Sequence, residues 1–113
     1  MARDYDQPCP VARTLDVIGE RWTLLILRDL FKFGPRRFKD FERTLDGIAP
    51  NTLSMRLKKL EAAGVIARRN YSDHPPRADY DLTERGRELG PVLLRLKRWG
   101  ERHLAPGEEK ISA

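Results

Sequence analysis

The side chains best suited to recognising another molecule gather in one short segment, residues 50–63. Its polar and flexible members are Asn51, Thr52, Met55, Arg56, Lys58 and Lys59. An Asn amide can make two hydrogen bonds to adenine, Arg or Lys can make two to guanine, and a Thr hydroxyl can bond a base or a phosphate. The composition of this segment therefore favours contacts with the base edges and phosphates of double-stranded DNA.

Three leucines predict how this segment presents those groups. At about 100° per residue along an α-helix, Leu53, Leu57 and Leu60 share one side, which we expect to face the core. The far side then carries Asn51, Met55, Lys58 and Lys59, and one flank carries Thr52 and Arg56. Helices of this kind usually meet bases near their N-terminal end, so Asn51, Thr52, Met55 and Arg56 are predicted to contact bases, and the two lysines phosphates. Taken alone, the pattern is more often a solvated helix surface; its place between a turn and a hairpin favours DNA recognition.

Two further groups of basic residues flank this segment. The later group, near the tip of a predicted hairpin, consists of Arg68, Arg69, His74 and Arg77. Such a basic ribbon can bind backbone phosphates or insert an Arg into the minor groove, although charge on a hairpin also protects an exposed strand edge. The earlier group, at the start of a short predicted helix, consists of Arg36, Arg37 and Lys39, which we predict to anchor phosphates.

Hydrophobic periodicity predicts the elements that would position these residues. Helices are expected over residues 10–18, 21–33, 38 to about 46, and 50–63, and the turn at 46–49 has the length of a helix-turn-helix. Residues 65–71 and 77–82 are predicted strands around a five-residue tip at 72–76. Thr83 then begins a long helix to about residue 104, weakened or kinked at Gly90-Pro91. This order predicts a mostly α fold with a small β-hairpin wing, an α+β winged helix-turn-helix.

Length and charge agree with this fold. The 113 residues are enough for one domain, with an expected core at residues 8–104 and tails at 1–7 and 105–113. Twenty-two basic and 17 acidic residues give a net charge of +5, which favours polyanionic partners. The chain has no run of 18 apolar residues and no apolar leader at its start, so we expect a cytoplasmic protein with no membrane partner.

Few residues are available for catalysis or metal binding. Cys9, His74 and His103 lie far apart in the sequence, and neither histidine has the sequence context of a catalytic base. We therefore expect no enzymatic activity, no cofactor and no bound metal. The main alternative to DNA binding is a winged-helix module that binds protein partners, which would need apolar or acidic anchors where this chain has Asn, Thr, Lys and Arg.

A series of short motifs covers roughly residues 8–104. They are Cys9-Pro10-Val11, Ile18-Gly19, Trp22-Thr23, Leu27-Arg28-Asp29-Leu30, Arg37-Phe38, Phe41, the string at 51–60, Gly64-Val65-Ile66, Pro75-Pro76, Tyr80-Asp81-Leu82-Thr83, Gly86 and Trp99. In this order they resemble the HxlR-type (DUF24) family of bacterial winged helix-turn-helix transcription regulators, which are related to the MarR type. The resemblance implies a homodimer that binds a pseudo-palindromic operator and usually represses transcription. It also implies a dimer interface formed by the first and last helices, which would include Val11, Leu15, Leu89, Val92, Leu93, Leu96 and Trp99.

Cys9 is a candidate redox sensor. It is the only cysteine and precedes Pro10 at the start of the first predicted helix, with Arg13 one turn further on. A helix N-terminus stabilises negative charge, and the thiolate is the reactive form of cysteine. Cys9 resembles the N-terminal cysteine that several relatives use to sense oxidants or electrophiles. In a dimer it could pair with its symmetry mate if the two Cα atoms come within about 4.4–6.8 Å, whereas alkylation or a mixed disulfide with a small thiol would need no such closeness. The alternative is an inert cysteine that only packs.

A small hydrophobic ligand is a second possible effector. It would bind between the dimer helices and the winged domain, in a pocket lined by Trp22, Phe31, Phe33, Met55 and Trp99. Aromatic residues at helical spacing belong to a core more often than to a ligand site, so the sequence leaves both alternatives open.

Overall fold

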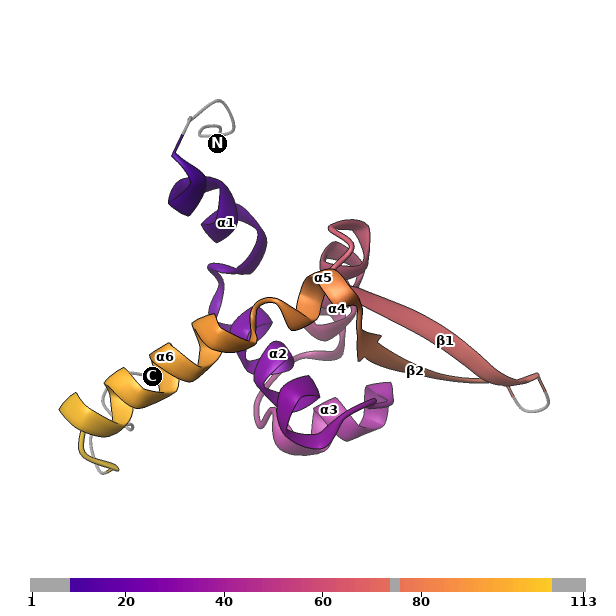
Figure 1. Cartoon of the computed structure of the whole chain (residues 1–113). Coiled ribbons are helices and arrows are strands. Elements are labelled where there is room, and N and C mark those ends of the chain that lie inside the picture. Colours follow the sequence, from indigo (N-terminus) through magenta and orange to yellow (C-terminus); the bar gives the residue numbers. More distant parts are fainter. Residues whose placement is uncertain (1–8, 74–75, 107–113) are drawn as a thin grey trace.

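The computed structural model describes residues 9–73 and 76–106. Its elements are, in chain order, α1 (Pro10–Ile18), α2 (Arg21–Phe33), α3 (Phe38–Thr44), α4 (Pro50–Ala62), β1 (Ile66–Asp73), β2 (Pro76–Leu82), α5 (Glu84–Arg87) and α6 (Gly90–His103) (Figure 1). A helix-turn-helix followed by a two-stranded antiparallel hairpin is the winged helix-turn-helix that the sequence predicts, and this fold class is confirmed.

The core lies where α2, α3 and α4 meet the base of the hairpin. Its fully buried members include Ile26, Leu27, Leu30, Phe41 and Ile66. The three leucines of α4, at positions 53, 57 and 60, are buried as their spacing predicts. Because side chains on one face of a helix recur every three to four residues, this burial determines which face of α4 is left toward solvent.

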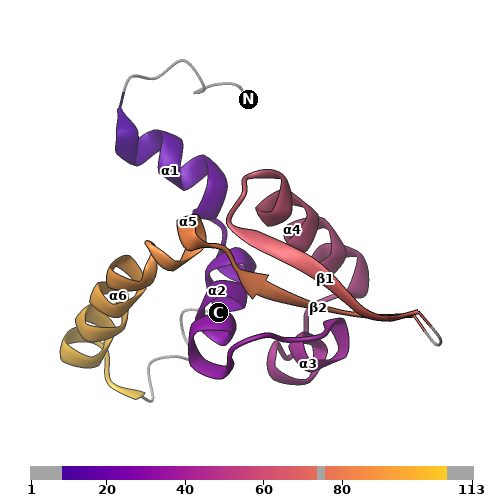
Figure 2. The same ribbon diagram turned by 45° about the vertical axis from the view of Figure 1, so that its right-hand side comes forward.

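The hairpin forms a wing that runs out from this core (Figure 2). Its strands pair from Ile66↔Leu82 to Asp73↔Pro76, with an irregularity between Asn70 and Ser72. The predicted five-residue tip is therefore wrong, since only residues 74–75 separate the paired ends. The extra residue in β1, Tyr71, shifts the register by one, as in a β-bulge. Pro76 is accepted because it is the first residue of its strand, where a missing N–H costs little.

The backbone of Arg36 attaches the wing to the helix-turn-helix. Its N–H donates to the Tyr80 carbonyl at 2.9 Å, and the Tyr80 N–H donates back at 2.7 Å. Together these bonds form an isolated antiparallel bridge beside β2. The segment between α2 and α3 thus acts as a short third strand that fixes the wing relative to both helices.

The C-terminal part of the chain is two helices rather than the single long helix predicted from Thr83 onward. The side chain of Thr83 accepts a hydrogen bond from the Gly86 N–H at 3.0 Å and caps α5, which ends at Arg87. A new helix, α6, begins at Gly90 with Pro91 in its first turn. Proline has no N–H to donate and its ring clashes with the carbonyl four residues earlier, so Pro91 separates the helices instead of kinking one.

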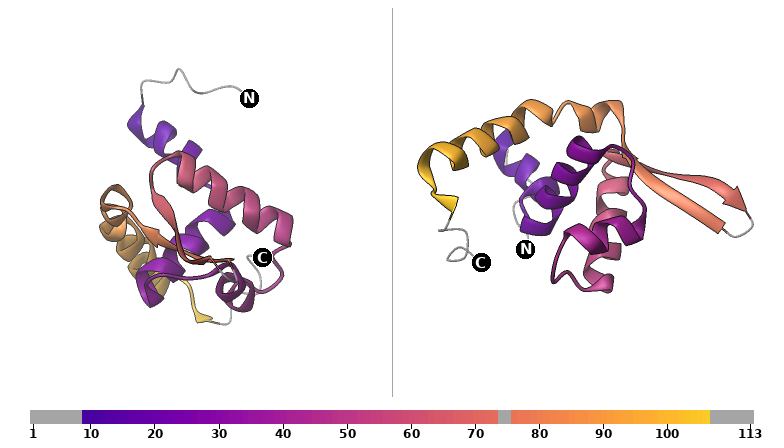
Figure 3. Two further views of the ribbon diagram at one scale, coloured as in Figure 1. Left: turned by 90° about the vertical axis from the view of Figure 1, so that its right-hand side faces the viewer. Right: turned by 90° about the horizontal axis from the view of Figure 1, so that it is seen from below.

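Two helices extend away from the winged body, α1 on one side and α6 on another (Figures 1 and 3). No residue of α6 is buried, and Ile18 is the one buried residue of α1. Apolar side chains at positions 11, 15, 92, 96 and 99 are exposed, including Trp99 at 59%. None of the helices in the described part of the chain has the length and apolar character needed to cross a membrane.

Truncating Leu57 tests the orientation of α4. We expect Leu57→Ala to lower the free energy of unfolding by about 2–5 kcal/mol, because it leaves a cavity in a fully buried site. Met55→Ala, on the opposite face of the same helix and 60% exposed, is the matched control and should change it by less than about 0.5 kcal/mol. Denaturant titrations of both variants measure the difference, and equal losses would contradict this orientation.

Candidate nucleic-acid interface

The exposed face of α4 carries most of the residues predicted to contact DNA. Asn51, Met55, Lys58 and Lys59 are all exposed, whereas Thr52 is half-buried on the flank. In the part of the chain that the structure describes, neither lysine forms an ion pair. The helix packs through its other side against α2 and β1, so this face is open beside the wing (Figure 2).

Arg56 differs from the other predicted base contacts because it has a partner within the chain. Its Nε lies 2.9 Å from Oε1 of Glu20, and its side chain is only 27% exposed. Glu20 is the N-cap of α2, and the same oxygen accepts hydrogen bonds from the backbone N–H and the hydroxyl of Thr23. Arg56 therefore lies toward α2 and away from the centre of the exposed face.

Donors around Glu20 keep its carboxyl ionised. Burial by itself raises its pKa, but the backbone N–H groups of Thr23 and Trp22, the Thr23 hydroxyl and the contact with Arg56 outweigh burial and hold the pKa below its ordinary value. The carboxylate is thus a fixed negative charge at the junction of α2 and α4. Sequence analysis missed it because nothing in the local pattern connects Glu20 with residue 56.

Arg36, which the sequence predicts as a phosphate anchor, faces the interior. Its side chain is only 13% exposed. Its Nη2 donates to the Asp40 carbonyl at 2.8 Å and to the Thr44 hydroxyl at 3.2 Å, and its guanidinium lies 4.4 Å from the centre of the Phe33 ring. Arg36 therefore joins α2 to α3, and this internal role removes it from the residues that we propose to contact DNA.

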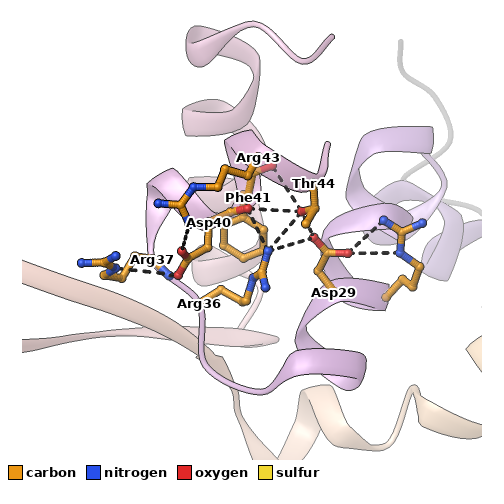
Figure 4. Close-up of polar contacts among 8 residues, drawn as sticks. Asp29, Arg36, Arg37, Asp40, Phe41, Arg43 and Thr44 are labelled. Atoms are coloured by element: carbon orange, nitrogen blue, oxygen red, sulfur yellow. Dashed lines mark hydrogen bonds and ion pairs between the residues drawn. The ribbon is translucent and has the colours of Figure 1, made fainter. Parts of the chain in front are cut away.

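A fully buried carboxylate, Asp29, connects the same two helices (Figure 4). Its Oδ1 accepts hydrogen bonds from Nε and Nη2 of Arg28 at 3.1 and 2.9 Å. Its Oδ2 accepts a hydrogen bond from the Thr44 hydroxyl and lies 3.8 Å from Arg36. A buried charge is tolerated only with such partners, so this cluster ties the position of α3 to that of α2. The sequence offered one signal for it, a carboxylate on the apolar side of a core helix.

The remaining basic residues of α3 lie at its surface. Arg37 and Arg43 form ion pairs with Asp40, at 3.7 and 3.0 Å, and Lys39 is exposed. The backbone N–H of Arg37 is the main cause that lowers the pKa of Asp40, burial opposes it, and the neighbouring arginines lower it further. Arg43, which the sequence analysis did not select, extends this basic surface.

Three of the four predicted wing residues are described, and all three are exposed. Arg69 is paired across the hairpin with Asp79, through bonds of 3.0 and 3.2 Å. Among the described residues, Arg68 and Arg77 form no ion pair. His74 lies outside the described residues.

Cys9 is exposed and is the N-cap residue of α1. Its carbonyl accepts the N–H of Arg13 at 3.1 Å, as expected for the start of a helix. In residues 9–73 and 76–106, no three His, Cys, Asp or Glu side chains are grouped as metal ligands.

An apolar groove of about 700 Å³ lies between α2 and α6. Its apolar lining residues are Leu24, Leu25, Phe31, Leu93, Leu94 and Leu96. The rest of the lining consists of Gly90 and three basic residues, Arg28, Lys32 and Lys97. Of the five residues predicted to line a ligand pocket, Phe31 alone contributes to this groove. The other four do not line this groove, and a ligand pocket between the dimer helices and the winged domain stays a prediction.

Comparison with known proteins decides the family. The model of the HxlR-like helix-turn-helix family matches residues 17–108. The chain belongs to this family. It is similar to YdeP of Bacillus subtilis, an uncharacterised HTH-type transcriptional regulator, with 43% identity over 100 residues that cover 88% of this chain and 77% of YdeP.

Solved structures of similar proteins agree with this assignment. The redox regulator HypR in its oxidised form has 40% identity and a TM-score of 0.80, covering 86% of this chain and 99% of HypR. A structure described as a MarR-family transcriptional regulator from Porphyromonas gingivalis has 30% identity and a TM-score of 0.78, covering 91% of this chain and all of that one. The chain is therefore a winged helix-turn-helix transcriptional regulator, and the resemblance found in its motifs is confirmed.

Proposed function

We propose that this HxlR-family regulator binds a pseudo-palindromic DNA operator as a homodimer and represses transcription from it. The observation that carries the proposal is the orientation of α4, whose leucines are buried while its amide and lysines face solvent beside a basic wing. A helix presented in this way fits the major groove, where each base pair displays a distinct set of donors and acceptors.

For the described residues, the proposed contacts follow from the exposure of each side chain; His74 is carried over from the sequence. Asn51, Thr52 and Met55 contact bases, and Lys58 and Lys59 contact phosphates. Phosphates beside the major groove are bound by Arg37 and Lys39 at the start of α3. The wing adds Arg68, Arg77 and His74, with Arg69 in a weaker role because Asp79 already neutralises it. Neither Lys58 nor Lys59 needs to break an ion pair with a described residue before it binds DNA.

The proposed dimer buries the apolar faces of α1 and α6. Val11 and Leu15 on α1 and Val92, Leu96 and Trp99 on α6 are exposed in the single chain. Burying one such side chain contributes about 1.5–3 kcal/mol, so these faces together favour association strongly. Leu89 and Leu93 pack partly against their own core and contribute less. A two-fold axis between the subunits would place the two α4 helices about 34–36 Å apart, one turn of DNA.

We further propose that oxidation of Cys9 controls DNA binding. The thiol is exposed and lies at the end of a helix assigned to the dimer interface, so a change at Cys9 would alter the spacing of the two α4 helices. Two thiols that form a disulfide release two protons and two electrons to an oxidant, and alkylation of one thiol would need no partner. The similarity to the redox regulator HypR supports this proposal. The α2–α6 groove is the alternative position for a small hydrophobic effector.

Removing the Lys59 charge tests the DNA-binding face. We expect Lys59→Ala to weaken binding to an operator selected from a random duplex library and to random duplex alike. The slope of log K, where K is the association constant, against log salt is negative. Its magnitude should decrease by about 0.9 for each phosphate that the variant no longer neutralises. Lys32→Ala removes a lysine charge on α2, outside the proposed DNA-binding face. It is the control and should leave the slope unchanged. Equal slopes for the two variants would contradict the proposed role of Lys59.

Introducing charge on α6 tests the dimer. We expect Trp99→Glu to convert the dimer to a monomer in sedimentation equilibrium, since an ionised carboxylate cannot be buried there without a partner. Met55→Glu, at an equally exposed site on α4, should remain dimeric although it no longer binds DNA. A monomeric wild-type protein, or a dimeric Trp99→Glu variant, would rule this interface out.

Replacing Cys9 tests the redox switch. We expect diamide to abolish operator binding by the wild-type protein and dithiothreitol to restore it, whereas Cys9→Ser should bind equally well under both conditions. Non-reducing electrophoresis then distinguishes a disulfide between subunits from a modification of single subunits. A Cys9→Ser protein that releases and rebinds DNA as the wild type does would exclude Cys9 as the sensor.

A further inference from the structure

We propose that Glu20 is a positioning residue that holds Arg56 on the protein, so that this arginine of the recognition helix orients α4 and does not contact DNA. The inference depends on the proposed function, because it concerns the same DNA-binding face. It assigns Arg56 a role different from the base contact that its residue type and spacing predict.

The Glu20 carboxylate is held in place by hydrogen bonds that do not involve Arg56. Oε1 accepts the Thr23 N–H at 2.9 Å and the Thr23 hydroxyl at 3.1 Å, and Thr23 itself is buried. These bonds are part of the N-cap of α2, which needs such an acceptor to begin. The acceptor is therefore preorganised, and the pair with Arg56 requires only the arginine side chain to be ordered.

Arg56 is also constrained from its own side. It lies between the buried positions of Leu53 and Leu60 on the surface of α4, three residues from one and four from the other, and its Nε is inaccessible to solvent. The contact at 2.9 Å is outside hydrogen-bond geometry, so the Glu20 charge is what compensates this buried nitrogen. Moving Arg56 toward DNA would break this contact and leave the Glu20 carboxylate without its cation.

Moving Arg56 would have a second cost at the DNA surface. Glu20 is 36% exposed at its side chain, and without Arg56 its carboxylate would be a free negative charge beside the helix that enters the groove. Like charges at short range repel, and the repulsion is screened by salt. The pair therefore keeps this edge of α4 neutral and leaves phosphate binding to Lys58 and Lys59.

The salt dependence of operator binding distinguishes an arginine that stays paired with Glu20 from one that binds DNA. We expect the Glu20→Gln/Arg56→Gln double variant to keep the wild-type slope of log K against log salt, because it removes a neutral pair and neutralises the same phosphates as the wild type. Glu20→Gln, whose amide oxygen can still cap α2, should steepen the slope by up to about 0.9 per subunit, because it frees Arg56 to bind a phosphate. Arg56→Gln alone should flatten the slope, because the Glu20 carboxylate that it leaves unpaired repels DNA, and the double variant should remove this effect.

Glu42→Gln is the matched control for the removal of a carboxylate. Glu42 is exposed on α3 and forms no ion pair with a described residue, and its replacement should leave the slope unchanged. A flatter slope for the double variant, or an unchanged slope for Glu20→Gln, would overturn the inference. If the wild type itself binds no duplex, the proposed function fails; if Lys59→Ala and the double variant both flatten the slope, the proposed function stands and only this inference fails.

A measurement on the wild-type protein covers the case in which a variant does not fold. The Nε–H resonance of Arg56 should keep its chemical shift when operator is added, because its surroundings do not change. A large shift of this resonance, with an intermolecular contact to DNA, would show that Arg56 leaves Glu20 in the complex.

Discussion

Burial of the leucine side of α4 is the constraint on which the rest of the structure depends. Leu53, Leu57 and Leu60 interlock with the core side chains of α2 and the base of the wing, and a helix that buries three such positions has one available rotation about its axis. That rotation determines which residues of α4 face solvent, which approach α2 and which could enter a groove. The wing is held to the same core through Ile66 and through the backbone bridge between Arg36 and Tyr80.

Basic residues divide into two groups once their surroundings are known. Arg36 and Arg56 are paired with carboxylates at junctions between helices. Lys39, Lys58 and Lys59 lie at the surface, and counterion release makes such free charges effective in binding polyanions. Net charge alone does not separate these groups, since each of these residues adds one positive charge to the total of +5.

The winged body buries its own apolar side chains, whereas α1 and α6 leave many of theirs exposed. The body buries its leucines and compensates the charge of Asp29 internally, but the two projecting helices expose apolar side chains along their length. The break before Gly90 is what directs α6 outward, because a continuous helix from Thr83 would follow the direction of α5. The same proline that interrupts the helix thus creates the surface that a second subunit could cover.

The sequence by itself determined the order of the elements, the helix-turn-helix spacing and the buried leucines of α4, because periodicity and turn residues act over a few neighbouring positions. It also identified the family from its motifs. Only the tertiary structure decided that Arg36 faces the interior, that Arg56 is paired with Glu20, that Asp29 joins α2 to α3, and that the hairpin pairs as far as Asp73 and Pro76. These outcomes depend on which helices meet and at what distance, and a partner that comes from another element is not encoded in the local pattern around a charged side chain.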